Sequence, residues 1–378
     1  MKILVLLSDL HDTLGGIQSF NRSLVSALRE LSRSHGWTLQ ILVLNDSRPA
    51  PTIETFAGSR VRFMWAALRA SHTADRVLFG HIHFSALSMG MPDVEKWLII
   101  HGIEAWNPLP RTKRLGLLKM DHVLAVSEFT KDRFVDFHGF DPRRCDVFPN
   151  TLLPLPSRGG NPPPQSSPIR GEEAVRNYRR RLGLPDGKMI LTVSRLETSE
   201  RYKCIDRMIL AMPAIVKRDP RAFYVLVGQG TDLARLKALA AQVHMQDRIY
   251  FAQRVSPDEL PLYYQSCDLF VLPSLEEGFG IVFLEAMAQA KACIGAKAGG
   301  VPEVIEDQVT GRLVDPRVPG SLEKQVMELL AHPARRRHMG TAGRERFEKN
   351  FSYPHFKRRL GHLLRSRTHQ SPERSLAA

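Results

Sequence analysis

The sequence contains little cysteine, and its four cysteines are scattered. They are Cys145, Cys204, Cys267 and Cys293, with no Cys-x-x-Cys spacing among the 378 residues. A zinc module of the usual kind needs paired cysteines, and a disulfide-stapled domain needs many more of them. The composition therefore excludes both classes and fits a reducing compartment.

A long apolar run is also absent. No stretch approaches the roughly 20 residues that a membrane-spanning helix needs. The apolar start at Lys2–Leu7 is followed closely by Asp9, and no small-residue cleavage site comes after it. We therefore interpret it as a buried first strand instead of a secretory signal, and we expect a cytoplasmic protein.

Acidic residues are outnumbered by basic ones. Lys and Arg total 53 against 39 Asp and Glu, which gives a formal net charge of +14. Such an excess favours phosphate-rich partners, namely nucleotide sugars, nucleic acid or an anionic membrane. A nucleic-acid binder would also need a groove-reading motif or basic residues interleaved with aromatic ones. The sequence has neither, so we predict no nucleic-acid partner.

Segments typical of strands and helices alternate along the chain. This alternation predicts parallel sheets covered by helices, and the length fits two domains. A stretch rich in Pro, Ser and Gly at 154–171 separates the two series. We predict an α/β fold of two Rossmann-like, doubly wound domains facing a central cleft. The predicted parts are residues 1–155, a linker at 156–175, a second domain at 176–352, a C-terminal helix at 353–368 that packs back on the first domain, and a disordered tail at 369–378.

Strand and helix positions follow from the same patterns. The expected strands are Lys2–Leu7, Thr38–Leu44, Arg76–Phe79, Trp97–Ile100, His122–Val126, Met189–Ser194, Phe223–Gly228, Arg248–Phe251, Leu269–Pro273 and Ala292–Ala296. The expected helices are Phe20–Ser32, Ile205–Lys217, Thr231–Val243, Gly280–Ala290 and Tyr353–Arg367. In open parallel sheets ligands bind beyond the carboxyl ends of the strands, so residues just after strands are the site candidates.

The stretch from residue 267 to residue 288 is the most informative. A strand-like run ends near Pro273, a glycine loop follows, and a helix-like run begins near Gly280. Glu277 lies in the loop and Glu285 on the helix, with seven residues between them. Glycines and free helix amides favour a phosphate at such a place, and the carboxylates can accept hydrogen bonds from sugar hydroxyls. The glutamate pair by itself is more typical of an amphipathic helix with two solvated side chains.

The complete string is far more specific than the pair. With its flanks Pro-Ser-x-x-Glu-Gly-Phe-Gly and Leu-Glu-Ala-Met-Ala it resembles glycosyltransferase family four, the group 1 retaining enzymes of GT-B fold with an E-x7-E motif. The resemblance covers nearly the whole chain and is densest from Ser194 to Asp315. It implies a GT-B fold with an acceptor-binding first domain and a second domain that binds a nucleotide sugar. It also implies that Glu285 binds the donor ribose and that Glu277 contacts the transferred sugar.

Further site residues follow from the resemblance. The amides of Phe279, Gly280 and Ile281 would bind the donor phosphate or sugar hydroxyls. Val255 and the Gly228-x-Gly230 turn would lie beside the donor. A dinucleotide fingerprint at that turn is disfavoured, because Leu233 stands where its third glycine should be. In the first domain, Gly16 would face the donor, and His101 would touch the transferred sugar or the acceptor. For both of these a purely structural role stays open.

Two basic residues fit the chemistry of the leaving group. Arg195 follows a strand and Lys203 comes eight residues later, like the Arg and Lys of the family's Gly-Arg-Leu…Lys-Gly element. Breaking a sugar–phosphate bond leaves charge on the diphosphate, which a preorganised Arg and Lys stabilise. A solvated basic loop is the alternative, and Arg201 suits that role.

No Asp-x-Asp motif follows a strand, so we expect no metal and no other cofactor. The pair His81-x-His83 leaves a metal site as a weak alternative, because no third ligand stands at matching spacing. Four other positions, Ser194, Cys204, Gln253 and Ala290, depart from the family pattern, since each stands where the family has glycine.

Basic residues also gather outside the expected site. They occur with leucines at Arg111, Lys113, Arg114 and Lys119, next at Arg176, Arg179, Arg180 and Arg181, and again at Lys357, Arg358 and Arg359. Such clusters fit peripheral binding to the inner face of an anionic membrane, and they fit solvated helix faces equally well.

The predicted function is therefore metal-independent transfer of a hexosyl unit, with retention, from a UDP- or GDP-sugar. The acceptor would be a glycan or lipid-linked saccharide, as in polysaccharide, exopolysaccharide or lipopolysaccharide synthesis. The alternatives are an epimerase-like enzyme of the same fold and, less favoured, an NAD-dependent α/β enzyme.

Overall fold

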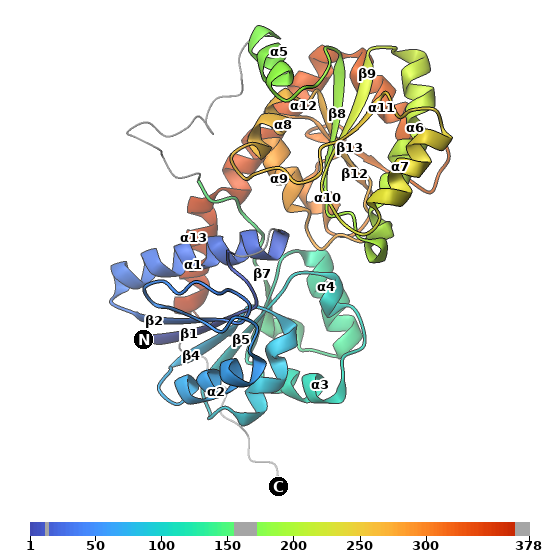
Figure 1. The fold of residues 1–378 in the computed structure, drawn as a ribbon. Helices are drawn as coiled ribbons and strands as arrows, with labels where there is room; N and C mark the ends of the chain where they lie inside the picture. The colour runs from blue at the N-terminus through green and yellow to red at the C-terminus, as the bar shows by residue number, and fades with distance from the viewer. Residues whose placement is uncertain (12–14, 155–171, 367–378) are drawn as a thin grey trace.

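Two parallel sheets, each with helices packed on it, make up the structure (Figure 1). The computed structural model describes residues 1–11, 15–154 and 172–366. Both sheets are α/β units built from strand–helix–strand crossovers, as the alternating sequence pattern predicts.

The first domain holds seven strands in the order β3-β2-β1-β4-β5-β6-β7. Its strands are β1 (Lys2–Leu7), β2 (Thr38–Val43), β3 (Ile53–Thr55), β4 (Arg76–Phe79), β5 (Glu95–Ile100), β6 (His122–Ala125) and β7 (Cys145–Val147). Its helices are α1 (Gly16–His35), α2 (Arg60–Ser71), α3 (Arg111–Leu117) and α4 (Glu128–His138), with short 3-10 helices η1 (Ile82–Gly90), η2 (Ile103–Ala105) and η3 (Pro142–Arg144).

The second domain holds six strands in the order β10-β9-β8-β11-β12-β13. Its strands are β8 (Lys188–Val193), β9 (Ala222–Val227), β10 (Ile249–Phe251), β11 (Leu269–Leu272), β12 (Cys293–Ala296) and β13 (Gly311–Val314). Its helices are α5 (Glu172–Arg181), α6 (Ile205–Arg218), α7 (Leu233–Gln242), α8 (Leu260–Ser266), α9 (Ile281–Ala288), α10 (Val301–Val304), α11 (Ser321–Ala331) and α12 (Pro333–Arg346), with a 3-10 helix η4 (Thr198–Lys203) and a π-helical turn η5 (Phe347–Phe351).

Both sheets reverse their winding direction at one point. In the first sheet the reversal falls between β1 and β4, and in the second between β8 and β11. All these neighbours pair in parallel, for example Leu6 with Phe79 and Leu269 with Ile190. The crevice beyond the carboxyl ends of strands at such a switch point is where open α/β sheets bind ligands. In the confirmed doubly wound topology, ligand-binding residues are therefore expected in the loops after β1, β8 and β11.

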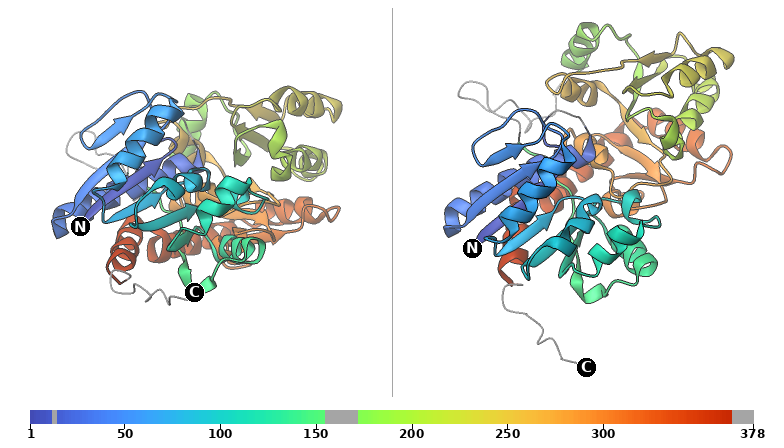
Figure 2. Two further views of the ribbon diagram at one scale, coloured as in Figure 1. Left: turned by 90° about the horizontal axis from the view of Figure 1, so that it is seen from below. Right: turned by 60° about the horizontal axis from the view of Figure 1, so that its bottom comes forward.

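The last helix, α13 (Tyr353–Ser366), crosses back to the first domain (Figure 2). Phe356 is buried against Phe20 of α1 and Phe148, with ring centroids 5.7 and 4.4 Å away. Tyr353 donates a hydrogen bond to Glu30 of α1 at 2.6 Å, and Lys357 forms an ion pair with the same carboxylate. The chain thus joins the two domains twice.

The sequence patterns miss three strands, β3, β7 and β13, and place several ends one or two residues away. The missed strands have three or four residues each, too few for a period to show. Helix α1 begins at Gly16, four residues before its predicted start. Helix α5 begins at Glu172, so the last four residues of the predicted linker are helical. The rest of that linker up to residue 171, and the predicted tail at 369–378, lie outside the described residues.

Three positions at which the resemblance implies glycine have a backbone conformation that favours glycine. Cys204, Gln253 and Ala290 have φ values of 53°, 28° and 53°, all in the left-handed region that side chains disfavour. Three residues that carry side chains therefore occupy a conformation that glycine adopts more readily.

Candidate active site

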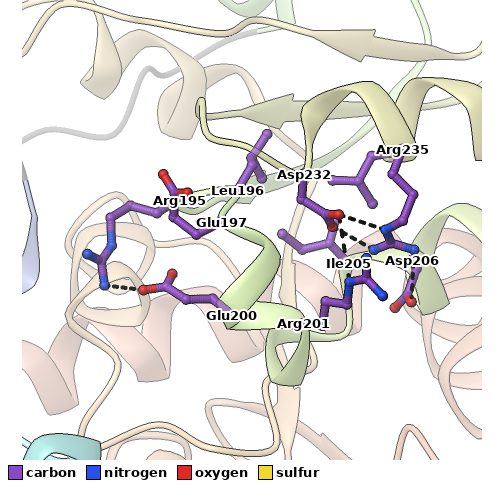
Figure 3. A pocket seen from close by; sticks show the side chains of 10 residues that line it. Arg195, Leu196, Glu197, Glu200, Arg201, Ile205, Asp206, Asp232 and Arg235 are labelled. Atoms are coloured by element: carbon purple, nitrogen blue, oxygen red, sulfur yellow. Dashed lines mark hydrogen bonds and ion pairs between the residues drawn. The ribbon is translucent and has the colours of Figure 1, made fainter.

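The loops at the second switch point bring the predicted basic residues together. Arg195 follows β8, and Lys203 ends η4. Both side chains form ion pairs with one carboxylate, that of Glu200. Figure 3 shows the pair of Arg195 with Glu200, and Lys203 Nζ lies 2.7 Å from Glu200 Oε2. Lys203 and Glu200 are 12% and 11% exposed, whereas Arg195 is 63% exposed. Arg195 therefore projects into the open, while Lys203 is held at the base of the loop.

A second ion network fixes the other side of this loop. Asp232 is buried and accepts two hydrogen bonds from Arg235, at 2.7 and 2.6 Å. Arg201 lies 3.8 Å from the same carboxylate, on the far side of η4 from Arg195 (Figure 3). A small pocket separates the two networks. Arg201, which is 57% exposed, therefore lies with Asp232 and apart from Arg195.

Glu277 lies in the loop after β11, close to these cations. Burial raises the pKa of Glu277, while the charge of Lys203 and a hydrogen bond from Ser274 oppose that rise. The loop is tied to η4 by the amide of Leu275, which donates to the carbonyl of Tyr202 at 2.8 Å. Arg195, Lys203 and Glu277 therefore lie close together.

The start of α9 presents unpaired backbone amides. Gly280 caps the helix with φ 87°, a conformation that favours glycine. Within the part of the chain that the structure describes, the amides of Phe279, Gly280 and Ile281 donate no hydrogen bond. Free amides at a helix N-terminus attract anions. The Phe279 side chain is buried against Phe351, so only its backbone is available for a ligand.

Glu285 lies one turn further along α9. Its Oε2 accepts a hydrogen bond of 2.6 Å from the buried hydroxyl of Tyr264 on α8. Burial raises the pKa of Glu285, and the hydrogen bond from Tyr264 and the charge of Arg22 oppose that rise. Arg22 belongs to α1 of the first domain, so this carboxylate is close to both domains.

The glycine turn before α1 lies opposite the glycine turn before α9, which belongs to the other domain. A Cβ atom on Gly16 would lie 3.6 Å from the Cγ2 atom of Ile281. The N-termini of α1 and α9 are therefore opposed. Gly16 therefore lies beside the start of α9.

Gly278 packs closely against the first domain. A Cβ atom there would lie 2.0 Å from the carbonyl oxygen of His101 and 2.9 Å from Gly102 Cα. The Gly278 carbonyl accepts hydrogen bonds from Ser127 and Thr130 at 2.6 and 3.3 Å. The loop that carries Glu277 thus packs directly on the loop that carries His101.

A carboxylate of the second domain caps a helix of the first. Glu303 accepts hydrogen bonds from the amides of Glu128 and Phe129, both at 2.8 Å, at the start of α4. Free amides at a helix start are stabilised by negative charge. This contact and the one at Gly278 lie side by side, because Gly300 packs on Gly278 and Ser127.

His101 follows β5 and points toward the interior of the first domain. Its Nε2 lies 2.9 Å from the carbonyl oxygen of Gly80, which fixes Nε2 as the protonated nitrogen. Burial lowers the pKa of His101, with the Glu104 carboxylate and the Gly80 carbonyl opposing that shift. The imidazole is therefore neutral at neutral pH, with Nδ1 as its acceptor.

The remaining candidates follow β9 and β10. Gly228 and Gly230 have φ values of 151° and 157°, and Cβ atoms there would lie 1.8 and 2.3 Å from the carbonyl oxygens of Ser194 and Leu196. The turn is thus packed against the loop that carries Arg195. Val255 is half-buried beyond β10.

Comparison with known proteins now identifies the family. Residues 175–346 match the family model described as Glycosyl transferases group 1. A GDP-mannose-dependent α-(1-6)-phosphatidylinositol monomannoside mannosyltransferase of Mycolicibacterium smegmatis is 31% identical over 280 residues, covering 71% of this chain and 69% of that protein. The chain belongs to the group 1 glycosyl transferases.

Other matches extend over the full length. The Mycobacterium tuberculosis mannosyltransferase of the same description is 29% identical over 96% of this chain and 98% of its own. Among solved structures, Anabaena HepE in complex with UDP matches with a TM-score of 0.77, 17% identity and coverage of 97% and 100%. Sucrose-phosphate synthase from Thermosynechococcus elongatus also gives 0.77, with 21% identity and coverage of 97% and 99%. These structural neighbours confirm the GT-B fold.

Clusters of metal ligands and membrane-spanning helices are both absent from the described part of this glycosyl transferase. In residues 1–11, 15–154 and 172–366, no group of three or more His, Cys, Asp or Glu side chains could hold a metal ion. His81 and His83 lie together, with ring centroids 4.3 Å apart, without a third such ligand in that part of the chain. None of the helices in the described ranges has the length and apolarity to cross a membrane.

Three residues of the site were not predicted from the sequence. Glu200 forms ion pairs with Arg195 and Lys203. Tyr264 donates a hydrogen bond to the Glu285 carboxylate. Glu303 accepts hydrogen bonds from the amides at the start of α4. Glu303 could have been suspected from its place in Gly-Gly-Val-Pro-Glu, but its partners lie on another domain. Arg179 was predicted to contribute to a basic surface, and that is wrong. It is buried and forms an ion pair with Asp268 at 2.7 Å.

Proposed function

We propose that this glycosyl transferase moves a hexosyl unit from a nucleotide-diphosphate sugar, GDP-mannose in the first instance, to a lipid-linked acceptor. The observation that carries the proposal is the convergence of Arg195, Lys203 and three unpaired amides of α9 beside Glu277 and Glu285. Cations and free amides suit a diphosphate, and the two carboxylates suit sugar and ribose hydroxyls.

The choice of donor and acceptor rests on the relatives. Several are named as GDP-mannose-dependent mannosyltransferases of phosphatidylinositol mannosides, from mycobacteria and Corynebacterium glutamicum. Others are named as D-inositol 3-phosphate glycosyltransferases. Both descriptions share an acceptor built on an inositol phosphate. More broadly, we propose that the product belongs to the synthesis of a surface polysaccharide or lipopolysaccharide.

The proposed mechanism assigns each group one task. Arg195 and Lys203 stabilise the charge that develops on the departing diphosphate, which lets the reaction proceed without a metal. Glu277 orients the transferred sugar and Glu285 the ribose. His101, held neutral, accepts a hydrogen bond through Nδ1 from the sugar or acceptor. The donor phosphate removes the proton of the attacking hydroxyl on the same face, so the anomeric configuration is retained.

A surface on the first domain supports work at a membrane. Helices α2 and α3 both pack on η1 and lie on the side away from the second domain (Figure 1). Val61 and Trp65 of α2 and Leu115 and Leu118 at α3 are exposed, Trp65 by 66% and Leu118 by 73%. Neither helix contains Asp or Glu. The exposed basic residues around them are Arg60, Arg62, Arg69, Arg111, Arg114 and Lys119.

Exposed apolar and basic side chains together favour an anionic lipid surface. We therefore extend the proposal to peripheral association with the cytoplasmic face of the membrane. Co-sedimentation with vesicles of anionic lipid should be reduced in Trp65→Ser/Leu118→Ser and unchanged in Val318→Ser, an exposed apolar position on the second domain.

The test of the activity is a transfer assay in EDTA. Purified protein is incubated with GDP-mannose, UDP-glucose or UDP-galactose and an inositol-phospholipid fraction, and products are read by mass spectrometry and by the anomeric coupling in NMR. An α-linked product from GDP-mannose in EDTA supports the proposal. An inverted product, or activity that requires added metal, contradicts the mechanism.

A further inference from the structure

A buried tyrosine next to Glu285 has no evident packing purpose for its hydroxyl. The Tyr264 ring is 2% exposed and packs near Phe270, with centroids 5.5 Å apart. A phenylalanine would fill the same space and would not bury a polar group, which costs free energy unless it is hydrogen-bonded. Tyr264 Oη has one hydrogen-bond partner among the described residues, Glu285 Oε2 at 2.6 Å.

The hydrogen bond leaves one half of the Glu285 carboxylate available. Oε2 is occupied by Tyr264, while Oε1 accepts no hydrogen bond from any described residue. The charge of Arg22, a residue of α1 in the first domain, also acts on Glu285. Arg22 is partly engaged elsewhere, since its Nη1 donates to the Leu10 carbonyl at 3.1 Å.

The two groups that act on Glu285 belong to different domains. Tyr264 lies on α8, which packs against α9 within the second domain. Arg22 lies on the first domain and would move away if the domains separated. Only Tyr264 therefore holds the carboxylate in every arrangement of the domains.

We propose that Tyr264 is a positioning residue for donor recognition: by fixing Oε2 of Glu285, it directs Oε1 at a ribose hydroxyl of the donor nucleotide. The inference rests on the proposed function, because it takes Glu285 as the ribose-binding group. Tyr264 itself does not touch the donor. Its hydroxyl fixes the rotamer of the carboxylate, so that Oε1 accepts a hydrogen bond from the ribose.

Discrimination between ribose and deoxyribose separates this role from a purely structural one. Calorimetric titrations compare GDP with its 2′-deoxy and 3′-deoxy analogues, on the wild type and on Tyr264→Phe. A hydrogen bond to a charged group is worth about tenfold or more in affinity. We expect the wild type to prefer GDP over at least one analogue by about tenfold, and Tyr264→Phe to lose most of that preference while binding the analogue as before.

Matched variants complete the test. Tyr263→Phe removes the hydroxyl of the neighbouring buried tyrosine, which donates no hydrogen bond among the described residues, and should keep the preference. Glu285→Gln should lose the preference as Tyr264→Phe does.

Two results would overturn the inference. One is equal weakening of GDP and its analogues in Tyr264→Phe, which is the mark of a structural defect. The other is a wild type that binds GDP without preferring ribose. Failure of GDP and UDP alike to bind the wild type would overturn the proposed function together with this inference.

Discussion

At the residue scale, three loop residues with side chains adopt a backbone conformation that favours glycine. Cys204, Gln253 and Ala290 stand where related proteins were expected to have glycine, and all three adopt positive φ. The sequence resemblance could identify these positions but not their conformation, because a side chain in the left-handed region is unusual. The positive φ values therefore indicate backbone strain at these three residues.

Ala290→Gly should therefore stabilise the protein. The left-handed backbone costs an alanine about 1 to 2 kcal/mol, and part of the gain is lost to the greater freedom of glycine in the unfolded chain. We expect the free energy of unfolding to rise by about 0.5 to 1 kcal/mol in urea titrations. Ala288→Gly, two residues earlier within α9, should lower it by about 1 kcal/mol. A loss of stability in Ala290→Gly would show that the local backbone is not strained.

The basic pair beside Glu200 carries the clearest catalytic prediction. Arg195→Ala should lower kcat/KM for sugar transfer by about 10²- to 10³-fold, because one preorganised cation facing the diphosphate is lost. Arg201→Ala, whose side chain lies at Asp232 on the far side of η4, should change kcat/KM little. Equal losses in both variants would mean that the loop binds by general charge and contains no specific clamp.

His81 makes a pH-dependent contribution to stability. Burial, assisted by the charges of His101, His83 and Lys113, lowers the pKa of His81 to about 3 from its usual 6.5. Between these two values the unfolded chain binds a proton that the folded chain does not, so stability falls as pH falls, by up to about 1.4 kcal/mol per pH unit.

His81→Asn should flatten that pH dependence. The amide oxygen of asparagine can still accept from the His83 amide, as His81 Nδ1 does at 3.1 Å, but it does not titrate. Urea unfolding between pH 6.5 and 4 should show a shallower slope for His81→Asn than for the wild type. Exposed His72→Asn serves as the control and should leave the slope unchanged. Parallel curves for His81→Asn and the wild type would contradict the assignment.

At the scale of elements, the long periodic segments were predictable and the short ones were not. The apolar run of β1 and the amphipathic pattern of α1 identify these elements from the sequence alone. Strands β3, β7 and β13 are too short to show a period and form because a neighbouring strand already offers hydrogen bonds. The two expected carboxylates and two expected cations do lie after strands or on α9. Their partners Glu200, Tyr264 and Glu303 needed the tertiary structure.

The loop at Gly278 provides a test of domain contact. Gly278→Ala would place a methyl group 2.0 Å from the His101 carbonyl oxygen, and neither backbone can yield without separating the domains. We expect kcat/KM to fall by about 10²-fold, the cost of misplacing reacting groups by about 1 Å. Circular dichroism and the melting temperature should stay close to those of the wild type, since each domain keeps its own fold. Wild-type activity in this variant would show that catalysis does not use the close contact.

At the scale of the whole molecule, the site belongs to neither domain alone. The groups that we propose to bind the donor, Arg195, Lys203, Glu277 and Glu285, come from the second domain, and His101 and Gly16 come from the first. The contacts of Gly278 and Glu303 bring the two sets together, and α13 links the end of the chain to the first domain. The two-domain architecture could be predicted from the alternation of strands and helices. How closely the domains approach could not, because it depends on a few backbone contacts.

The central claim is that the second domain binds a nucleoside diphosphate through Arg195, Lys203 and Glu285. The most direct measurement is the melting temperature in EDTA with GDP, UDP, ADP, TDP or NAD. A ligand at about 100 times its Kd stabilises a fold by about 2.7 kcal/mol. We predict that one diphosphate, GDP first, raises the melting temperature of the wild type, and that Arg195→Ala and Glu285→Ala lose the rise. Stabilisation by NAD alone, or by no diphosphate, would contradict the account.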